Sequence, residues 1–358
     1  MKFRRLAAVA VAVAIAALGA VATAQAATVE TVATGLNNPR GVAIGPDGAV
    51  YVAQAGKGGR LCRGKGENKL CFGLSSGIVK VAGGAKSTVA KGLLSVAGGG
   101  GVFASGVHGV SVDPDGTVFG VETSGTPRDI GGAPGWARRQ AGRLFDLTSG
   151  NTPVANLSLI EWNRNLDKVK GDRNSNPYAV LALADRQIVV DAGANAVLQV
   201  QGGNVSLLAV IPKNGKAQSV PTSIALGPDG SYYVGELAEG AGKGKARVWK
   251  VPATGGTPTV HATGFTMITG LAFGPDGSMF VTEFAKNIRK NNLLGTVVRV
   301  ASDGSRTRLG GNKLLAPTGA AVDSTGAVYV SNFSVLPART PKKSPFKGAG
   351  GTLVKITP

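Results

Sequence analysis

The chain has 358 residues, 55 of them glycine, with 43% hydrophobic residues and a formal net charge of +19. The glycines follow no Gly-X-Y period, which excludes collagen, and the hydrophobic content is too high for a disordered chain. Charged residues make up only 16% of the chain, too few for a coiled coil. Glycine and proline interrupt the chain so densely that long helices are not expected, and the composition predicts an all-β protein.

Residues 1–26 have the pattern of a secretory signal peptide. A basic start is followed by an apolar run over residues 6–22 and by an Ala-Gln-Ala triplet at residues 24–26. A retained membrane anchor is the alternative, but the run is short and rich in alanine. We expect export by the general secretory route and removal of this segment. The mature chain would be secreted, would keep a net charge of +16 and would have no transmembrane segment.

Cys62 and Cys71 are the only two cysteines of the chain. In an exported protein, an even number of cysteines predicts a disulfide. The bridge would close a short loop and stabilise the fold by about 2–3 kcal/mol. The alternative is a pair of metal ligands, but two cysteines alone do not complete a zinc site and no histidine is near them in the sequence.

A hairpin pattern recurs six times along the rest of the chain. Each copy has an apolar strand, a turn that is often Pro-Asp-Gly, and a second apolar strand; the copies begin near residues 37, 106, 175, 220, 267 and 315. A third strand follows each hairpin, and a fourth strand follows in five of the six copies. Repeated four-stranded antiparallel units of this kind predict a β-propeller.

The two ends of the chain complete the pattern. The sixth copy stops after its third strand, whereas residues 28–36 have the pattern of a fourth strand with no copy of their own. Pairing of the two segments would close the ring and remove exposed sheet edges. We therefore expect residues 27–358 to form one six-bladed β-propeller, acting as a monomer. An open β-solenoid is the alternative, and no seventh copy is found.

The long insertions carry most of the basic residues. They lie in the loops between second and third strands and between blades, which share one face of a propeller; we call it the insertion face. A basic face attracts anions, so we expect an anionic polymer, a cell-envelope surface or a small ligand as partner, and no sequence-specific nucleic acid. The alternative is a charge that only keeps the protein soluble. The expected ligand-binding residues are Arg138, Arg139, Arg289, Lys290, Lys342 and Lys343.

A polar side chain stands at the end of each second strand. The six residues are Gln54, Glu122, Asp191, Glu236, Glu283 and Asn332. Symmetry would bring them together as a ring near the channel mouth, where carboxylate and amide oxygens could bind Ca²⁺. Two alternatives stay open. Basic side chains from the long loops could neutralise the carboxylates, or each residue could hydrogen-bond to backbone at its own strand end.

His108 begins the inner strand of the second copy and is expected to face the channel near Glu122. Beside a channel calcium it could act as the base of an enzyme that hydrolyses lactones or esters. The alternative is a histidine hydrogen-bonded in the channel wall. His261 is expected on an outer strand, exposed and without a role. The sequence thus favours a secreted binding protein, with a calcium-dependent hydrolase as the alternative.

Several segments together resemble the ScyD/ScyE family of exported bacterial propellers. They are the export signal, the cysteine loop, the segment from Asn174 to Asn195 with its NSNPYAV and VVDAGAN stretches, and the terminal GTLVKI strand. The resemblance implies export and an NHL-like or gluconolactonase-like six-bladed propeller, and it implies no particular activity. In one departure, residues 163–174 are basic where the family usually has an acidic stretch, which does not favour a cation site there.

Overall fold

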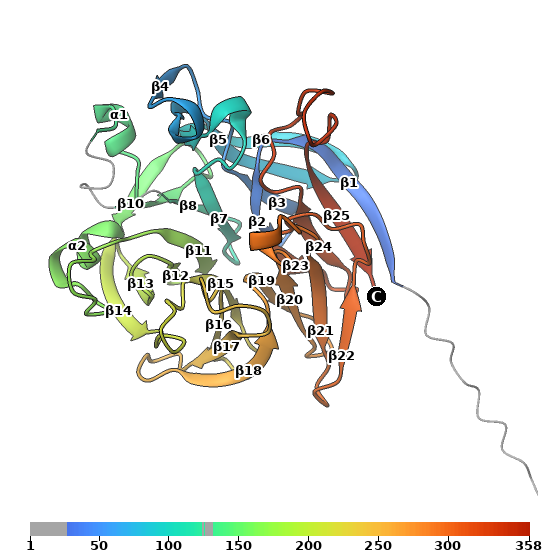
Figure 1. Cartoon of the computed structure of the whole chain (residues 1–358). Coiled ribbons are helices and arrows are strands. Elements are labelled where there is room, and N and C mark those ends of the chain that lie inside the picture. The colour runs from blue at the N-terminus through green and yellow to red at the C-terminus, as the bar shows by residue number, and fades with distance from the viewer. Residues whose placement is uncertain (1–26, 124, 126–131) are drawn as a thin grey trace, which may run out of the picture.

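The computed structural model of the protein describes residues 27–123, 125 and 132–358 (Figure 1). The expected signal peptide, residues 1–26, lies outside this range. The described strands form six antiparallel sheets, five with four strands and one with a fifth, short strand, and the sheets stand around a central channel. This confirms the six-bladed propeller expected from the repeats.

The blades are numbered here in chain order, and their strands run from the channel outward. Blade 1 contains β2 Pro39–Ile44, β3 Val50–Gln54, β5 Leu70–Ala82 and β6 Ala85–Ala97, with β4 Leu61–Arg63 beside β5. Blade 2 contains β7 Val107–Val112, β8 Val118–Glu122, β9 Arg143–Asp146 and β10 Thr152–Asn156. Blade 3 contains β11 Pro177–Ala182, β12 Gln187–Asp191, β13 Ala196–Gln201 and β14 Asn204–Val210.

The second half of the ring repeats this order. Blade 4 contains β15 Pro221–Leu226, β16 Tyr232–Glu236, β17 Ala246–Val251 and β18 Thr259–Phe265. Blade 5 contains β19 Ile268–Phe273, β20 Met279–Glu283, β21 Thr296–Val300 and β22 Arg306–Leu309. Blade 6 contains β23 Ala320–Val322, β24 Val328–Asn332, β25 Gly351–Thr357 and β1 Thr28–Leu36.

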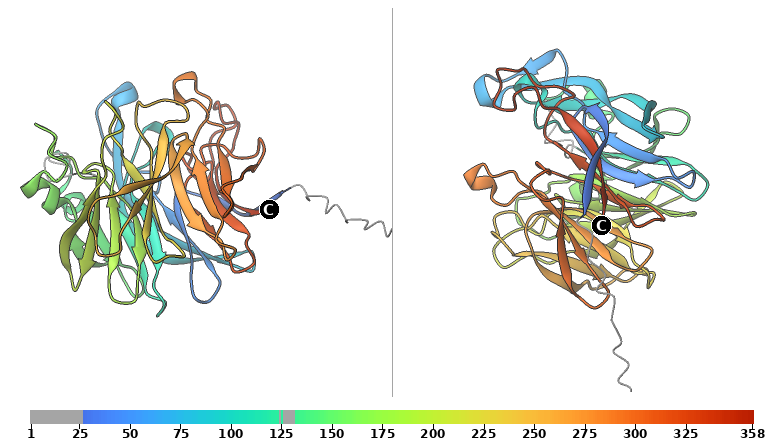
Figure 2. Two further views of the ribbon diagram at one scale, coloured as in Figure 1. Left: turned by 90° about the horizontal axis from the view of Figure 1, so that it is seen from below. Right: turned by 90° about the vertical axis from the view of Figure 1, so that its right-hand side faces the viewer.

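The two ends of the chain close the ring in blade 6. Strand β1 pairs antiparallel with β25, from Thr28 opposite Thr357 to Leu36 opposite Gly351. In the right-hand view of Figure 2 the blue first strand lies along the red last strand. The N-terminal strand therefore completes the last blade, as the sequence predicts.

The turns between first and second strands form for a local chemical reason. In blade 1, Asp47 accepts a hydrogen bond from the amide of Ala49, and Gly48 takes the positive φ of 73° that the turn requires. Asp229 and Asp276 accept the amides of Ser231 and Ser278 in the same way, whereas in blade 2 Asp113, which precedes the turn, accepts the amide of Thr117. The repeated tripeptide thus fixes the register of the inner hairpins.

The hydrophobic core lies between neighbouring blades. Between blades 1 and 2, for example, Tyr51 and Ile78 pack with Val110 and Phe145. Each of the other five blade junctions contains a comparable buried cluster. Each sheet therefore buries both faces, and the ring of junctions holds the central channel in a fixed shape.

Helical segments are short, as expected from the glycine and proline content. They are α1 Gly135–Arg138, α2 Ser158–Arg164 and the 3₁₀ turns η1 Gly66–Asn68, η2 Gly99–Gly101 and η3 Ile288–Lys290. Helix α2 lies in the insertion between blades 2 and 3, which the sequence predicts to be a loop. It ends at Asn165, whose left-handed φ of 48° stops the helix. No helix in the described ranges is long and apolar enough to cross a bilayer.

The long insertions gather on one face of the ring. In the left-hand view of Figure 2 they rise above the propeller, and the inner hairpin turns lie on the opposite side. Cys62 on β4 and Cys71 on β5 face each other and form the expected disulfide. The bridge thus fastens the insertion of blade 1.

Candidate ligand site at the end of the central channel

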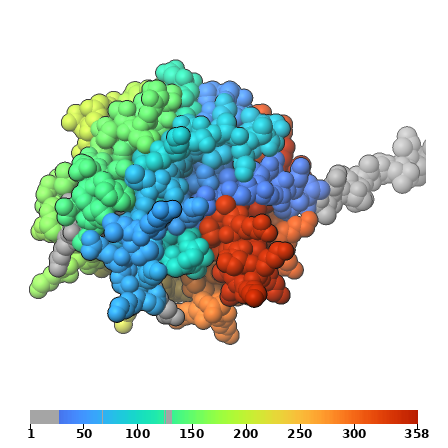
Figure 3. All heavy atoms as spheres, turned by 90° about the horizontal axis from the view of Figure 1, so that it is seen from above, coloured from blue at the N-terminus to red at the C-terminus, as the bar shows by residue number. Residues whose placement is uncertain are grey.

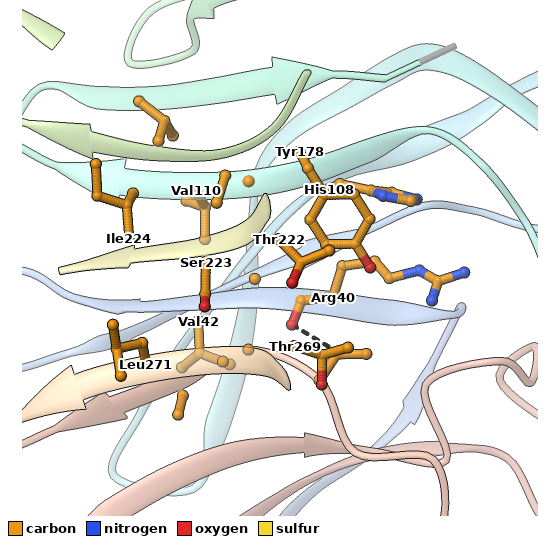
Figure 4. Close-up of a pocket in the computed structure, with 18 residues that line it drawn as sticks. Arg40, Val42, His108, Val110, Tyr178, Thr222, Ser223, Ile224, Thr269 and Leu271 are labelled. Carbon is orange, nitrogen blue, oxygen red and sulfur yellow. Dashed lines mark hydrogen bonds between the residues drawn. The ribbon is translucent and has the colours of Figure 1, made fainter. Parts of the chain in front are cut away.

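The channel is lined by three consecutive residues from each blade, which lie in the first strand except in blade 6, where Thr318 and Gly319 come directly before β23. They form three tiers along its axis (Figure 4). The polar tier is Arg40, His108, Tyr178, Thr222, Thr269 and Thr318. The small tier is Gly41, Gly109, Ala179, Ser223, Gly270 and Gly319. The apolar tier is Val42, Val110, Val180, Ile224, Leu271 and Ala320. The polar tier comes first in each set of three and therefore lies toward the insertion face.

The small tier makes the channel narrow. A Cβ atom on Gly41 would lie 2.6 Å from the carbonyl oxygen of His108, and one on Gly319 would lie 2.7 Å from that of Arg40. Both distances are too short for a side chain, so glycine is what allows neighbouring strands to approach. The cavity that remains has a volume of about 60 Å³, enough for a few water molecules or one small polar group.

Three threonines seal the polar tier between blades 4, 5 and 6. The hydroxyl of Thr222 donates to the carbonyl of Ile268 at 2.5 Å, and that of Thr269 donates to Pro317 at 3.0 Å. The hydroxyl of Thr318 lies 3.2 Å from the carbonyl oxygen of Arg40. Each threonine thus links its blade to the next one. We call this side of the tier the threonine half.

The other side of the polar tier carries Arg40, His108 and Tyr178, and we call it the Arg-His-Tyr half. Arg40 is only 8% exposed. Its Nη2 donates to the carbonyl of Ala104 at 2.7 Å, but its Nε has no partner in the described chain, and no carboxylate of a described residue lies within ion-pairing distance. Burial lowers the pKa of Arg40, because the loss of water disfavours its charged form.

His108 and Tyr178 stand beside this arginine. Their rings meet edge to face with centroids 4.7 Å apart, and Figure 4 shows both side chains with Arg40 at one end of the channel. His108 is 7% exposed, and neither ring nitrogen has a hydrogen-bond partner among the described residues. Burial and the charge of Arg40 hold the pKa of His108 well below its usual value, so the ring is neutral. Burial also raises the pKa of Tyr178, which keeps its hydroxyl protonated.

The segment between blades 1 and 2, residues 98–106, lies beside this end of the channel, where Arg40 donates to the carbonyl of Ala104. Asn38 fastens it, donating from its side chain to the carbonyl of Gly101 and accepting from the amide of Ala104. The amide of Phe103 donates to Val335 in the C-terminal loop. The blue and cyan segments of blade 1 and the red C-terminal loop lie side by side in Figure 3. Phe103 is 56% exposed with a left-handed φ of 51°, a conformation that bulky residues adopt only under constraint.

The six polar residues at the second-strand ends lie one strand behind the channel. Four of them accept the backbone amide that leads into their own inner strand: Gln54 from Asn37, Asp191 from Asn176, Glu283 from Thr266 and Asn332 from Leu315, each at 2.7 Å. Each of the four therefore anchors the segment that enters its own blade. This arrangement corresponds to the alternative in which each residue hydrogen-bonds to backbone at its own strand end.

Arginines neutralise two of the carboxylates. Glu236 is fully buried, pairs with Arg247 at 2.7 Å and accepts a hydrogen bond from the indole of Trp249 at 2.9 Å. Glu283 pairs with Arg308 at 2.7 Å. These arginines come from the third and fourth strands of the same blades, and not from the long loops.

Glu122 is the exception in this set. It is fully buried, and neither carboxylate oxygen has a hydrogen-bond partner in the part of the chain that the structure describes. Burial raises its pKa well above the usual value, so the folded protein favours the protonated carboxyl. The expected approach of His108 to Glu122 is not made through any described hydrogen bond.

These positions do not fit a shared calcium ion at the channel mouth. The oxygens of Asp191, Glu236 and Glu283 already accept donors from their own blades. No group of three or more His, Cys, Asp or Glu side chains is arranged to hold a metal ion among the described residues. The metal-ligand role of the six residues and the catalytic role of His108 stay predictions.

The six expected ligand-face residues belong to three insertions. Arg138 and Arg139 lie at the end of α1, Arg289 and Lys290 lie in η3, and Lys342 and Lys343 lie in the loop before β25. Sequence reasoning missed Arg40 and Tyr178. The signal was available in the aligned repeats, where the first channel-lining residue of each blade is threonine in three blades and arginine, histidine or tyrosine in the others.

Comparison with known proteins agrees with the fold. Residues 161–337, just under half of the chain, match the model of the SMP-30/Gluconolactonase/LRE-like region. No curated protein matches the sequence significantly.

Many solved structures resemble this one at low sequence identity. A gluconolactonase from Xanthomonas campestris has a TM-score of 0.51 at 10% identity, with 92% of this chain and 89% of that chain covered. Regucalcin from Agrobacterium tumefaciens, described as a calcium-binding protein, has a TM-score of 0.52 at 15% identity, covering 91% and 93%. A virginiamycin B lyase from Staphylococcus aureus has a TM-score of 0.50 at 13% identity, covering 93% and 99%.

At these identities the structural likeness carries the fold and not the activity. The matches do not confirm the narrower resemblance to the ScyD/ScyE family, which stays a prediction. The family model and the solved structures together support a six-bladed propeller of the SMP-30/gluconolactonase-like kind.

Proposed function

We propose that the protein is a ligand-binding propeller that takes the carboxylate of an anionic small molecule at the polar end of its channel. The observation that carries this proposal is Arg40, a buried guanidinium without a carboxylate partner among the described residues. An unpaired buried charge destabilises a fold by several kcal/mol. A bound carboxylate would supply the missing counter-charge and match the planar fork of the guanidinium.

The neighbours of Arg40 suit the same ligand. The protonated hydroxyl of Tyr178 and the N–H of neutral His108 are donors that face the channel end, and neither ring nitrogen of His108 has a partner among the described residues. The cavity of about 60 Å³ admits the head group and not a whole sugar-sized molecule. The rest of the ligand would lie among the insertion loops.

We also propose that the protein works outside the cell. The signal-like residues 1–26 and the disulfide between Cys62 and Cys71 support export. The basic insertions support attraction of an anionic small ligand to the face where the Arg-His-Tyr half opens. A cell-envelope surface or an anionic polymer remains the alternative partner for this face.

A thermal-shift titration with sodium acetate tests the channel proposal, with sodium chloride of equal ionic strength as reference. Acetate is expected to raise Tm with a saturable dose dependence, since it binds only the folded state. Arg40→Met is expected to abolish that rise. Lys216→Met removes an exposed charge away from the channel and is expected to keep it. An equal acetate response in Arg40→Met and the unsubstituted protein would reject the site.

The second candidate is hydrolysis of a lactone or ester at the same place, and the family match at residues 161–337 supports it. Neutral His108 would take a proton from a water that attacks the carbonyl carbon, and Arg40 would stabilise the oxyanion. When the C–O bond breaks, the leaving alkoxide would receive that proton. Glu122 is the one carboxylate of the ring that could accept a calcium ion without losing a described hydrogen bond.

Assays with δ-valerolactone and phenyl acetate, each with calcium or with a chelator, separate the two candidates. The hydrolase predicts turnover that His108→Gln abolishes and that follows the deprotonation of one group at low pH. The binding proposal predicts a rate equal to buffer alone. Turnover that survives His108→Gln would exclude His108 as the base.

A further inference from the structure

A second cavity lies on the insertion face between blades 4 and 5. It has a volume of about 320 Å³, at the lower end of the range of small-molecule sites. The insertion that follows β16 forms one wall and the insertion that contains η3 forms the other. In the left-hand view of Figure 2, the orange turn of the second insertion stands above the ring. This cavity is separate from the channel and shares no lining residue with it.

The backbone around the cavity is held in place. The amide of Gly244 donates to the hydroxyl of Thr266 at 3.0 Å, and the amide of Thr266 donates to buried Glu283 at 2.7 Å. Asn287 caps η3 by accepting the amide of Lys290. Two residues of the lining, Ala238 and Met267, have left-handed φ values of 52° and 51°. The same conformation recurs at the matching entries of other blades, at Asn38, Val220 and Ala316, so it belongs to the repeat. The two walls are thus built on anchored loops.

The chemistry of the lining combines apolar side chains with positive charge. Leu237, Met267 and Ile288 supply apolar surface, and Ile288 is 48% exposed although it is a large hydrophobic residue. Lys243, Lys286 and Arg289 supply three cations, and none of them forms an ion pair with another described residue. Glu239 is the only acid in the lining.

From this combination we infer a second binding site, for an amphipathic monoanion whose apolar body lies against Ile288 and Met267 and whose charged group meets Lys286 and Arg289. Apolar contact without the cations would accept neutral molecules equally well. The cations without the apolar surface would accept inorganic anions. A site with apolar surface and cations together selects molecules that have an apolar body and a negative charge, such as an aromatic or aliphatic carboxylate or sulfonate.

Two fluorescent probes that differ only in charge test this inference. The full-length protein is titrated with 8-anilinonaphthalene-1-sulfonate and with N-phenyl-1-naphthylamine, which lacks the sulfonate. The anionic probe is expected to bind at least tenfold more tightly than the neutral one, at one site per chain. In Lys286→Ala/Arg289→Ala the preference is expected to disappear while the neutral probe binds as before.

Matched variants distinguish this cavity from the rest of the basic face and from the channel. Lys342→Ala/Lys343→Ala removes the same charge from another insertion and is expected to keep the tenfold preference; an equal loss in both double variants would overturn the site in favour of unspecific attraction to the basic face. Ile288→Ser is expected to weaken both probes. Arg40→Met separates this inference from the channel proposal, because binding of the anionic probe should not change in it. Loss of probe binding in Arg40→Met would assign the probe to the channel.

Discussion

The two halves of the polar tier differ in how their buried polar groups find hydrogen-bond partners. In the threonine half, the hydroxyls of Thr222 and Thr269 are consumed by carbonyls of the next blade. In the Arg-His-Tyr half, the equivalent positions carry larger polar groups, and Nε of Arg40 and both ring nitrogens of His108 have no hydrogen-bond partner among the described residues. In a nearly symmetric ring, the threonine half therefore links neighbouring blades, whereas the Arg-His-Tyr half has polar groups that are not used for such links.

The contrast extends beyond the channel. Glu236 in blade 4 and Glu122 in blade 2 occupy matching positions, but Glu236 has an arginine, an indole and an amide as donors whereas Glu122 has none among described residues. Every carboxylate, guanidinium or imidazole with an unsatisfied buried atom in the described chain lies in blades 1 to 3 or in the loops between them. In blades 4 to 6 only hydroxyl groups are left unsatisfied within the described ranges. Blades 1 to 3 are therefore where bound ligands could compensate buried charge.

The largest expected effect concerns the small tier, which lies next to both halves of the polar tier. Gly319→Val should destabilise the protein by about 3 kcal/mol, because its Cβ would meet three backbone atoms of blade 1 at 2.7 Å. Gly41→Val should act similarly from the other half, since its Cβ meets the carbonyl oxygen of His108. Urea unfolding measures both. Ser302→Val serves as the control, because Ser302 lies in an exposed turn and does not have a positive φ.

Arg40→Met should have the opposite sign in the absence of ligand. It replaces an uncompensated buried charge by an apolar side chain of similar length, so we expect the free energy of unfolding to rise by roughly 1–3 kcal/mol. The matched change in the threonine half, Thr222→Val, removes a satisfied donor and should lower it. If both substitutions destabilise the protein to the same extent, the two halves are equivalent and the comparison fails.

Glu122→Gln should stabilise the protein in a pH-dependent way. Because burial raises the pKa of Glu122, stability from this group is present below the unfolded pKa near 4.5 and is lost as the pH rises toward the folded value. The substitution should therefore raise Tm by roughly 2–6 °C at pH 8 and by much less at pH 4. Glu236→Gln should lower Tm at pH 8 instead, because it removes the partner of Arg247.

Thr269→Val should cost about 1 kcal/mol of stability, since it leaves the carbonyl of Pro317 without its donor. It should not change the response to acetate. Tyr178→Phe should instead keep Tm in the absence of ligand within about 1–2 °C of that of the unsubstituted protein. Its Tm should rise less on addition of acetate. Differential scanning calorimetry with and without acetate distinguishes the two outcomes, and a reduced acetate response in Thr269→Val would extend the site around the whole ring.

The smallest effect is expected at the opposite face. Hydrogen bonds from Lys250 and from the amide of Ser231 hold the pKa of Asp229 at about 2, so its contribution is present above about pH 4 and is lost as the pH falls toward 2. The pair is exposed and screened, so Asp229→Asn should change stability by about 0.5 kcal/mol or less at neutral pH. A pH series of Tm values measures the difference, which should vanish below about pH 2.

The sequence predicted the scaffold because each blade is specified locally. Apolar alternation, turn tripeptides and one unpaired strand at each end are enough to count six blades and to close the ring. The site was harder to predict because the repeats are alike in strand pattern and differ in one position. The ring of second-strand residues was expected to converge, yet side chains such as Asp191 and Glu283 turn back onto the amides of their own blades.

Two further features depended on long-range contacts. Whether Arg40 has a counter-ion is settled by blades that are far away in the sequence, and the spacing of residues carries no information about it. The cavity between blades 4 and 5 depends on how two insertions stand relative to each other. Composition could predict that these loops are basic, but not that they enclose a space.

The pairing of β1 with β25 has a consequence for the order in which the protein can be made. Thr28 lies near the start of the described chain, whereas its partner Thr357 lies near its end. Blade 6 cannot form until β25 has been synthesised, so β1 stays an unpaired edge until then. The final step of folding is thus the pairing of β1 with β25. This step is expected to be slow, because the two strands lie far apart along the chain.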